Sequence, residues 1–499
     1  MRNLPIAIIA LLWMQCGHGS ETTQTESNGD MYTETFRPQF HFSPPSQWMN
    51  DPNGMVFYQG EYHLFYQYHP ESTVWGPMHW GHAVSKDLVH WENLPIALYP
   101  DELGTIFSGS AVIDHQNTSG LGSDDNPPMV AIYTNHHAEK EQAGDVDFQV
   151  QSIAYSLDKG RSWTKYAKNP VLDNPGIRDF RDPKVFWHGP TSRWVMALAV
   201  EKVIHLYTSE NLLDWTFASE FGEGIGAKGG VWECPDLFPM NDPNGSEKWV
   251  MLVSINPGGP NLGSATQYFI GNFDGKQFTP LDTVIRWIDY GPDNYAGVTW
   301  SNIPDTDGRR LFIGWMSNWL YAGAVPTVTW RSAKTIPRSL SLKGIHGKHL
   351  LHSQPIDELQ GLRRDETVFL DEKRFDLPSA TSEIIVEIPD GDLESILVQN
   401  DSGEQVILRF ADGKLELDRT QSGLSDFHAD FANVHTAPLD GVSVTSVQIF
   451  LDSSSIEVFI NSGELVMTAI LFPTEPYRTL ELTGGMTKTR VFSLASIWK

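Results

Sequence analysis

Cysteine is almost absent from this chain of 499 residues, which contains only Cys16 and Cys234. Two thiols cannot build a disulfide framework, and they cannot supply a zinc cluster held by thiolates. The sequence therefore excludes the small disulfide-stapled domains and the thiolate zinc modules.

Basic residues are scarce as well. The chain has 35 Lys and Arg against 62 Asp and Glu, a formal net charge of −27. Nucleic-acid binding needs clustered cations that replace counterions, so this deficit argues against nucleic acid as a partner. Only 19% of the residues are charged and 40% are hydrophobic, which indicates a packed globular protein.

Long hydrophobic runs are missing too. The apolar run Leu4–Met14 has eleven residues, whereas a helix that spans a bilayer needs about 20, and no later stretch comes near that length. The sequence therefore predicts no transmembrane segment. With Arg2 ahead of it, the run is typical of an export signal over residues 1–19, and we expect a flexible polar leader over 20–35.

Cys16 lies where a bacterial lipoprotein signal carries its acylated cysteine. The residues before it, Trp13-Met14-Gln15, are larger than such a signal prefers. The sequence leaves a lipid anchor at Cys16 and free export as equal alternatives. In either case we expect an exported protein, extracellular, periplasmic or on the cell surface.

Aromatic residues are abundant, with 17 Trp, 25 Phe and 15 Tyr, while helical signals are few. Between residues 36 and 344, short β-branched and aromatic runs alternate with Gly, Pro, Asn and Asp clusters. A weak repeat of strand, polar turn and aromatic strand start recurs along this region. Its aromatic positions are Trp91, Trp163, Trp215 and Phe278. Their separation suits one four-stranded blade with long loops, so we predict a five-bladed β-propeller over 36–344.

The texture changes after Gly344. Ser353–Arg363 has the best helical pattern, and we expect a linker over 345–365. Alternating strands of ordinary composition follow over 366–499, where tryptophan nearly vanishes, which predicts a β-sandwich. The expected fold class is therefore all-β, a five-bladed β-propeller followed by a C-terminal β-sandwich.

Three carboxylates stand before or beside a proline in three different repeat units. They are Asp51 in "WMNDPNG", Asp182 in "FRDPKVFW" and Glu233 in "WECPDLF". Equivalent positions of successive blades converge on a propeller axis, and two carboxylates suffice to cleave a glycoside. The residues alone leave open whether this set is catalytic or consists of three structural turn residues.

These segments resemble glycoside hydrolase family 32, the β-fructofuranosidases. The resemblance extends over further motifs in order, including "YHLFYQYHP" (Tyr62–Pro70), "FSGSA" (Phe107–Ala111), "DYGPDNYAGVTW" (Asp289–Trp300) and "GWMSNWLYA" (Gly314–Ala322). It implies a retaining double displacement at C2 of a terminal β-fructofuranosyl unit. Fructan or sucrose is then the substrate, and neither a metal nor an organic cofactor is implied.

The resemblance also implies a role for each matching residue. Asp51 matches the nucleophile, Glu233 the acid/base, and Asp182 the carboxylate that binds furanose hydroxyls. The other matches, which we expect around the sugar, are the polar residues Asn50, Gln67, Ser108 and Arg181, the aromatic walls Trp75, Phe107 and Trp315, and the rim residues Asn294 and Tyr295. Cys234 is expected to border and orient Glu233, without acting as a nucleophile.

The subtype is the least determined part of the prediction. "TWRSAKTIPRSLSL" is most similar to exo-inulinases and exo-levanases, so we expect an exo-acting enzyme on levan, inulin or sucrose. Endo action and fructosyl transfer are alternatives within the same fold. An inverting propeller glycosidase and a silent fructan-binding protein are less favoured, since "WMNDPNG" and "ECP" occur together and all three carboxylates are present.

Overall fold

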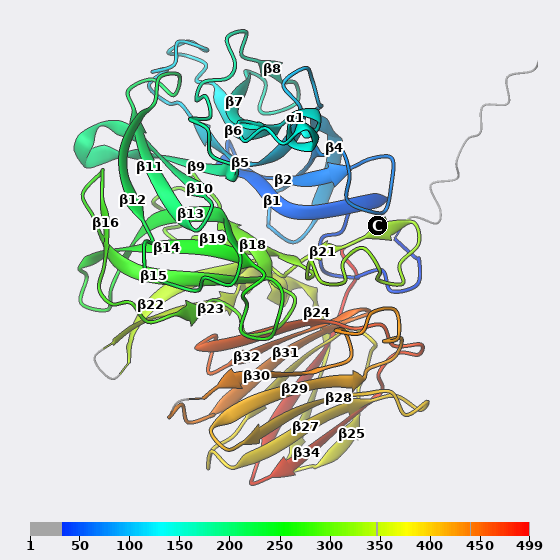
Figure 1. Ribbon diagram of the computed structural model, residues 1–499. Helices are drawn as coiled ribbons and strands as arrows, with labels where there is room; N and C mark the ends of the chain where they lie inside the picture. Colours follow the sequence, from blue (N-terminus) through cyan, green and yellow to red (C-terminus); the bar gives the residue numbers. More distant parts are fainter. Residues whose placement is uncertain (1–31, 346–347, 440, 499) are drawn as a thin grey trace, which may run out of the picture.

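The structure is a computed structural model that describes residues 32–345, 348–439 and 441–498. The predicted signal over 1–19 and Cys16 lie outside the described residues, and the leader over 20–35 is described only from Tyr32 onward. The chain forms two lobes built almost entirely of strands (Figure 1). The short helical elements are α1 (Ala138–Ala143), η1 (Gly189–Thr191) and η2 (Asp357–Leu362). No helix in the described ranges is long and apolar enough to cross a membrane.

Five antiparallel sheets make the N-terminal lobe. The first sheet contains β1 (Gln47–Tyr58), β2 (Glu61–His69), β3 (His79–Ser85), β4 (Trp91–Leu98) and, paired outside β1, β20 (Trp330–Arg331). The second contains β5 (Thr105–Ile113), β6 (Met129–His136), β7 (Gln149–Ser156) and β8 (Thr164–Lys165). The third contains β9 (Phe180–His188), β10 (Arg193–Val200), β11 (Val203–Ser209) and β12 (Thr216–Phe221).

The last two sheets complete this lobe. The fourth contains β13 (Val231–Asn241), β14 (Glu247–Asn256), β15 (Ala265–Phe273), β16 (Phe278–Pro280) and β17 (Arg286–Trp287). The fifth contains β18 (Tyr295–Thr299), β19 (Arg310–Met316), β21 (Ala333–Lys334), β22 (Arg338–Ile345) and β23 (Lys348–Pro355). The expected linker over 345–365 thus contains β23 and η2, and the predicted helix at Ser353–Arg363 is wrong in its first residues, which continue the β23 strand.

The first strand of each sheet lies at the centre of the lobe. β1, β5, β9, β13 and β18 contact one another in that order, and β18 contacts β1 again, so the sheets form a closed ring. Parallel pairing of β20 with β1, through Gln47 opposite Trp330, joins the late part of the lobe to its first sheet. The sheets are therefore the blades of a propeller, and their innermost strands surround its axis.

The aromatic repeat marks the outermost strands. Trp91 and Phe278 begin β4 and β16, and Trp163 and Trp215 immediately precede β8 and β12. Trp163 and Trp215 each donate an indole N–H to a carbonyl of the preceding turn, at 3.0 Å. The repeat therefore identifies the same structural position in four blades, as the sequence predicted.

Two six-stranded sheets make the C-terminal lobe. One contains β24 (Arg363–Leu370), β35 (Lys488–Leu494), β26 (Ser382–Glu387), β31 (Ser446–Asp452), β32 (Ser455–Ile460) and β33 (Leu465–Ile470). The other contains β25 (Arg374–Asp376), β34 (Thr479–Gly484), β27 (Leu393–Gln399), β28 (Gln405–Ala411), β29 (Lys414–Gln421) and β30 (Val434–Pro438). Leu408, Leu417, Ile449 and Val458 are among the residues of the shared core. The predicted class, an all-β propeller followed by a β-sandwich, is confirmed.

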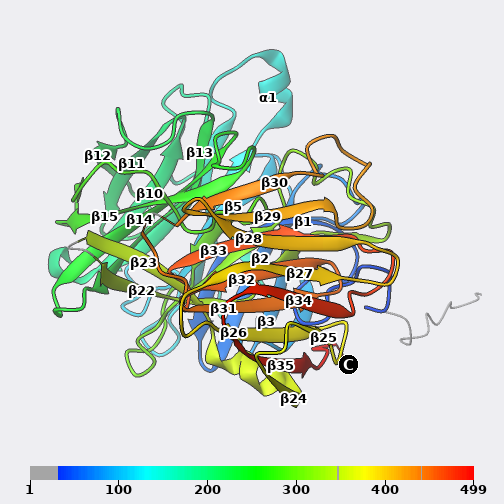
Figure 2. The same cartoon turned by 90° about the horizontal axis from the view of Figure 1, so that it is seen from below.

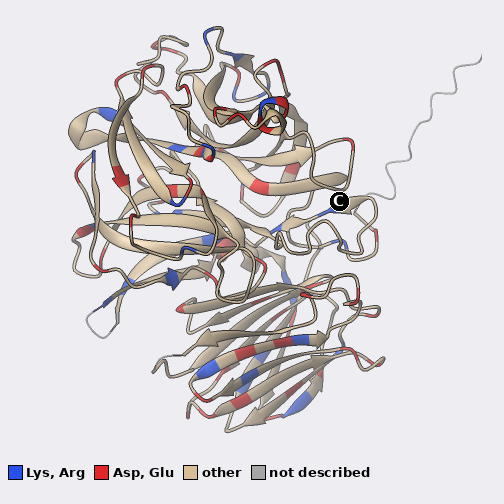
Figure 3. Cartoon of the chain, viewed as in Figure 1, with Lys and Arg blue, Asp and Glu red and all other residues tan. Residues whose placement is uncertain are grey.

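The two lobes lie side by side (Figures 1 and 2), and they are joined by hydrogen bonds between β33 and the segment that leads into β18. The backbone N–H of Tyr290 donates to the Val466 carbonyl at 2.8 Å, and that of Asp293 donates to the Thr468 carbonyl at 3.2 Å. Charged residues occur over both lobes (Figure 3), and some of them are buried in this interface. Strand β18 therefore enters the propeller from a segment fastened to the sandwich.

Candidate active site

The predicted catalytic carboxylates all lie on innermost strands. Asp51 is on β1, Asp182 on β9 and Glu233 on β13, while β5 supplies Ser108 and β18 supplies Tyr295. Each blade therefore contributes at least one polar side chain to the site. The ring brings together residues that are far apart in the sequence.

Every innermost strand is bulged where it contributes this side chain. The pairing register shifts at Asn50-Asp51, Phe107-Ser108, Asp182-Pro183, Cys234-Pro235 and Ala296-Gly297. At three of these bulges a residue other than glycine has a positive φ: Asp182 at 64°, Cys234 at 45° and Ala296 at 52°. A bulge turns a side chain out of the normal alternation of a strand, so these irregularities aim the polar groups at the axis.

Besides the thiol of Cys234, two side chains donate hydrogen bonds to Asp51. Its Oδ2 accepts the Ser108 hydroxyl at 2.7 Å, and its Oδ1 accepts the Asn50 amide at 3.1 Å. The Asn50 carbonyl oxygen of the side chain in turn accepts the Trp48 indole N–H at 2.8 Å. This chain of contacts fixes the plane of the Asp51 carboxylate.

Asp182 is buried between the other charges of the site. Its Oδ2 accepts the backbone N–H of Cys234 at 3.0 Å and lies 4.0 Å from Arg181 Nε. Burial raises the pKa of Asp182 to about 7, and the charges of Glu233 and Asp51 add to this rise while Arg181 opposes it.

Glu233 is contacted at both carboxylate oxygens. Oε1 accepts Arg181 Nη2 at 3.1 Å, and Oε2 accepts the hydroxyl of Tyr295. Arg181 is itself anchored, since its Nη1 lies 2.5 Å from Asp179 Oδ1. Tyr295 stays protonated, because burial and the neighbouring Glu233 raise its pKa well above the usual value.

Cys234 contacts two of the carboxylates through its thiol. Sγ lies 3.5 Å from Asp51 Oδ2 and 3.6 Å from Asp182 Oδ2. Burial and these acidic neighbours raise the pKa of the thiol well above its usual value. Cys234 is therefore a neutral thiol that contacts both Asp51 and Asp182. It was expected to border and orient Glu233, but the hydrogen bonds of its thiol go to the other two carboxylates.

These groups open onto a cavity of about 320 Å³. The predicted residues that line it are Asn50, Asp51, Gln67, Trp75, Phe107, Ser108, Arg181, Asp182 and Glu233. Trp75 is 47% exposed and its ring meets that of Phe107 edge-on at 6.0 Å, which gives the mouth an aromatic wall. Gln67 donates to Asn53 Oδ1 at 2.8 Å.

Three predicted contacts lie elsewhere. Trp315 was expected in the pocket wall, but it is fully buried and packs between Trp48, Trp319 and Tyr295, because β19 lies behind β18. Asn294 was expected at the rim, but it is buried and donates to Asp289 at the interface between the lobes. Tyr295 is likewise buried and reaches the site only through Glu233.

Sequence reasoning missed several residues of the cavity wall. Trp319 occupies the place expected for Trp315, four positions later in the same "GWMSNWLYA" motif and beyond the end of β19. The others come from the second and third blades: His136, Glu141, Phe148, Gln149 and Asp179. His136 stacks on Phe107 with ring centroids 4.2 Å apart. His136 ends β6, Glu141 lies on α1, Gln149 begins β7, and Phe148 and Asp179 directly precede strands, so these residues meet only through the packing of neighbouring blades.

No group of three or more His, Cys, Asp and Glu in the part of the chain that the structure describes is arranged to hold a metal ion. The carboxylates of the cavity are instead engaged by Arg181, by hydroxyl groups and by amides. The arrangement places three carboxyl groups in one small cavity, and a pair of carboxyl groups is what glycoside cleavage uses.

Known proteins share both lobes. Residues 41–355 match the glycosyl hydrolases family 32 N-terminal domain, and residues 358–499 match the family 32 C-terminal domain. The chain is 48% identical to a levanase of Bacillus subtilis, over 94% of this chain and 71% of that protein. It is 40% identical to an extracellular exo-inulinase of Aspergillus awamori, over 94% of this chain and 96% of that protein.

Solved structures of related enzymes have the same fold as this chain. The exo-inulinase structure from Aspergillus awamori superposes with a TM-score of 0.85 at 38% identity, covering 94% of this chain and all of that one. A fructofuranosidase from Schwanniomyces occidentalis complexed with fructose gives a TM-score of 0.83 at 32% identity, with the same coverage. Sequence, fold and the convergence of three carboxylates lead to one conclusion: this chain is a glycoside hydrolase that belongs to family 32.

Proposed function

We propose that this enzyme is an exo-acting β-fructofuranosidase that releases terminal, non-reducing fructosyl units from levan or inulin, and from sucrose. The observation that carries the proposal is the meeting of Asp51, Asp182 and Glu233 in one cavity of about 320 Å³. The names of its relatives, levanase, exo-inulinase and fructofuranosidase, support the same substrate class.

The proposed reaction is a double displacement with retention. An oxygen of Asp51 attacks C2 of the fructosyl unit, and the C2–O bond to the leaving group breaks as Glu233 transfers its proton to that oxygen. Glu233 then removes a proton from water, the water oxygen attacks C2, and the Asp51 ester bond breaks. Ser108 and Asn50 orient the attacking carboxylate, and Arg181 and Tyr295 orient the acid/base.

Asp182 has a separate role in this scheme. Its buried carboxyl group lies between Arg181 and Cys234, where it can bind furanose hydroxyls as a donor or an acceptor. When ionised, it also places negative charge beside the positive charge that develops on the sugar ring. The transition state is then better stabilised than the bound substrate.

The shape of the cavity favours exo action. Side chains of the bulged innermost strands line one part of it, and Trp75 and Phe107 form an aromatic wall. A chain end can enter such a cavity, whereas an internal unit would need a groove open at both ends. The relatives include extracellular exo-inulinases, which supports export of this enzyme as well.

Product analysis tests the proposal. Sucrose, inulin and levan are incubated with the enzyme, and products are resolved over time. Fructose as the only early product from the polymers is expected, whereas early oligosaccharides would establish endo action. Longer oligosaccharides formed from sucrose would establish fructosyl transfer.

Asp51→Asn and Glu233→Gln test the assigned roles. Each variant should lower kcat by about 10³-fold or more while the fold is retained, because each removes a group that forms or breaks a bond. The exposed Asp214→Asn provides the matched control and should keep full activity. Near-normal turnover in either site variant would contradict the mechanism.

A further inference from the structure

A second cavity, of about 680 Å³, lies at the other end of the propeller axis. It is lined by the last residues of β5 and β9, by the middle of β13 and by the segment that follows β18. Trp187 in this lining stands five residues after Asp182 on β9, and a rise of about 3.3 Å per residue places the two roughly 16 Å apart. This distal cavity shares no lining residue with the active-site cavity, and the proposed mechanism does not use it.

Aromatic rings form much of the wall of the distal cavity. Phe186 and Trp187 of β9 are both partly exposed there. The ring of Phe186 lies 5.5 Å from that of Trp249, and Trp187 meets Trp194 edge-on at 5.2 Å. Flat aromatic surfaces that are apolar at the face and lie beside polar groups suit the packing of a sugar ring.

Arg310 adds hydrogen-bond donors to this wall. Its guanidinium carbon lies 4.8 Å from the centre of the Phe238 ring, and the residue is only partly buried. Within the described residues, the Arg310 side chain forms no hydrogen bond and no ion pair. The neighbouring Arg309, by contrast, contacts Asp307 at 2.6 Å and Glu358 at 2.8 Å. The N–H groups of Arg310 are therefore available to a ligand in the distal cavity.

Acceptors lie in the same lining. Asp236 is 0% exposed, and its Oδ2 accepts the Thr299 N–H at 2.7 Å and lies 3.1 Å from Lys184 Nζ. Its Oδ1 has no hydrogen-bond partner among the described residues. Glu247 and Asp305 are exposed at the surface of the cavity. The distal cavity therefore combines aromatic rings with donors and acceptors of both charges.

This combination identifies the class of ligand. An anion in the cavity would meet the carboxylates of Asp236, Glu247 and Asp305, and a cation would meet Arg310 and Lys184. A neutral polyhydroxyl ligand meets neither obstacle, because each of its hydroxyl groups both donates and accepts a hydrogen bond. Its apolar C–H faces can also pack on the aromatic wall. A neutral saccharide is the ligand that fits all of these groups.

We propose that the distal cavity is a second saccharide-binding site, which holds a fructosyl unit of the fructan substrate without cleaving it. The inference rests on the proposed function for the identity of the sugar. The carboxylates Asp51 and Glu233 line only the active-site cavity, so a unit held in the distal cavity is not hydrolysed. Binding there would keep the enzyme on a long polymer and raise the local concentration of chain ends.

The number of bound sugars tests the proposal. Asp51→Asn, which should not hydrolyse its ligand, is titrated with radiolabelled fructotetraose, linked β-2,6 or β-2,1, in equilibrium dialysis. Two molecules should bind per chain, one in each cavity. Added to this background, Arg310→Met and Trp187→Ala should each weaken binding of one of the two molecules by about tenfold, the loss typical of an arginine or tryptophan at the centre of a binding site. Arg374→Met and Phe217→Ala, exposed and outside the cavity, are the matched controls and should still bind two.

Kinetics of the active enzyme give a second measurement. Arg310→Met should lower kcat/KM for levan or inulin polymer severalfold, while kcat/KM for sucrose should change by less than about twofold, because the disaccharide needs only the active-site cavity. An equal loss on sucrose and polymer would show that Arg310 supports the fold of the axis, and would overturn the proposal.

Two binding results would also overturn the proposal. One bound molecule in Asp51→Asn would leave no second site, and two tightly bound molecules in Arg310→Met would place that site elsewhere. If Trp187→Ala does not fold, Arg310→Met, on another blade, still decides. One bound sugar with normal fructose release would reject only the distal site, whereas two bound sugars with no fructose release by the parent would reject only the proposed function.

Discussion

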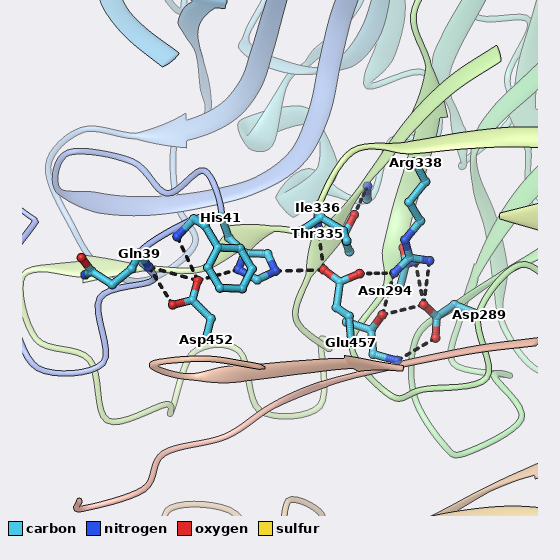
Figure 4. A network of polar contacts seen from close by, with 12 residues as sticks. Gln39, His41, Asp289, Asn294, Thr335, Ile336, Arg338, Asp452 and Glu457 are labelled. Atoms are coloured by element: carbon cyan, nitrogen blue, oxygen red, sulfur yellow. Dashed lines mark hydrogen bonds and ion pairs between the residues drawn. The ribbon is translucent and has the colours of Figure 1, made fainter. Parts of the chain in front are cut away.

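Charged side chains are buried in two regions, the propeller axis and the interface between the lobes, and they are paired differently in each. At the propeller axis, Asp51, Asp182 and Glu233 lie together against the cation Arg181, with Lys334 behind them. At the interface between the lobes, each buried charge contacts a partner of opposite sign (Figure 4). The first region keeps three carboxylates close together, which suits their proposed roles as nucleophile, acid/base and stabilising group, whereas the charge pairs of the second join the two lobes.

The interface network runs across both lobes without a break. Arg338 of β22 lies 2.9 Å from Asp289 and 2.5 Å from Glu457 of the sandwich. Glu457 also contacts His41, which pairs with Asp452 at 2.7 Å. Burial alone would raise the pKa of Glu457, but Arg338 and His41 hold it below its usual range. At the interface, pairing with opposite charges offsets the cost of burying each charged side chain. At the axis, this cost is only partly offset, and the pKa of Asp182 is raised.

Removal of the central interface cation should have the largest effect on stability. Arg338→Met leaves Asp289 buried without its cation and Glu457 with His41 alone, which should lower the free energy of unfolding by about 3–5 kcal/mol. Denaturant unfolding measures this loss. Arg193→Met, which breaks an exposed pair with Glu210, is the matched control and should cost less than about 1 kcal/mol. Equal losses of unfolding free energy in the two variants would show that the buried interface pairs stabilise the protein no more than an exposed pair does.

Neutralisation of Asp182 at the propeller axis should raise the free energy of unfolding, whereas the loss of Arg338 lowers it. Asp182 has a folded pKa near 7, so the unfolded chain loses its proton first and stability falls as the pH rises from about 4 to 7. Asp182→Asn removes that cost and should stabilise the protein by on the order of 2 kcal/mol at pH 8, with no gain at pH 4. An asparagine can accept the Cys234 N–H and tolerates the φ of 64°.

The same variant should be a poor enzyme. Loss of the charge should lower kcat by about 10²–10³-fold, as for other groups that stabilise a transition state. Unfolding curves at pH 4 and 8, together with sucrose kinetics, measure both effects on one protein. If Asp182→Asn is less stable than the parent at pH 8, the charge of Asp182 stabilises the fold, as the interface charges are expected to do, and the predicted difference between the two regions is wrong.

A smaller effect is expected from titration of the interface. Asp452 and Glu457 raise the pKa of His41 to about 9 despite its burial. The stability that this charge contributes is complete below the unfolded pKa, near 6.5, and is lost as the pH rises through 9. The free energy of unfolding should fall by on the order of 1–2 kcal/mol from this group between pH 6.5 and 10. His41→Gln should show a smaller fall over the same range, and an unchanged fall would assign it to other groups.

Much of the propeller could be predicted because its signals are local. Trp91, Trp163, Trp215 and Phe278 recur at the start of the outermost strands, and the indoles of Trp163 and Trp215 donate to the preceding turn of their own blade. The three carboxylates stood out as a set because each stands before or beside a proline, and prolines are common where strand pairing is interrupted. Their catalytic roles were expected only from the family resemblance. The bulges at these positions are the structural counterpart of that pattern.

Other contacts depended on tertiary packing that the sequence does not encode locally. Trp315 and Trp319 share a motif, but only the end of β19 at Met316 decides which indole faces the cavity. Asn294 and Tyr295 are adjacent, yet one faces the sandwich and the other faces Glu233. Lys334 lies in a motif that indicated subtype, and nothing in the sequence shows that it reaches the strand of Asp51.

The pairing of β1 with β20 has a consequence for how the enzyme comes into being. The strand that carries Asp51 is made early, but its parallel neighbour follows only after residues 59–329 have been synthesised. The Ile497 N–H also donates to the Gln39 carbonyl at 2.8 Å, so the two ends of the described chain are fastened to each other. Such long-range closure makes folding slow and late. The strand that carries Asp51 can therefore reach its final pairing only after Trp330 and Arg331 of β20 have been made.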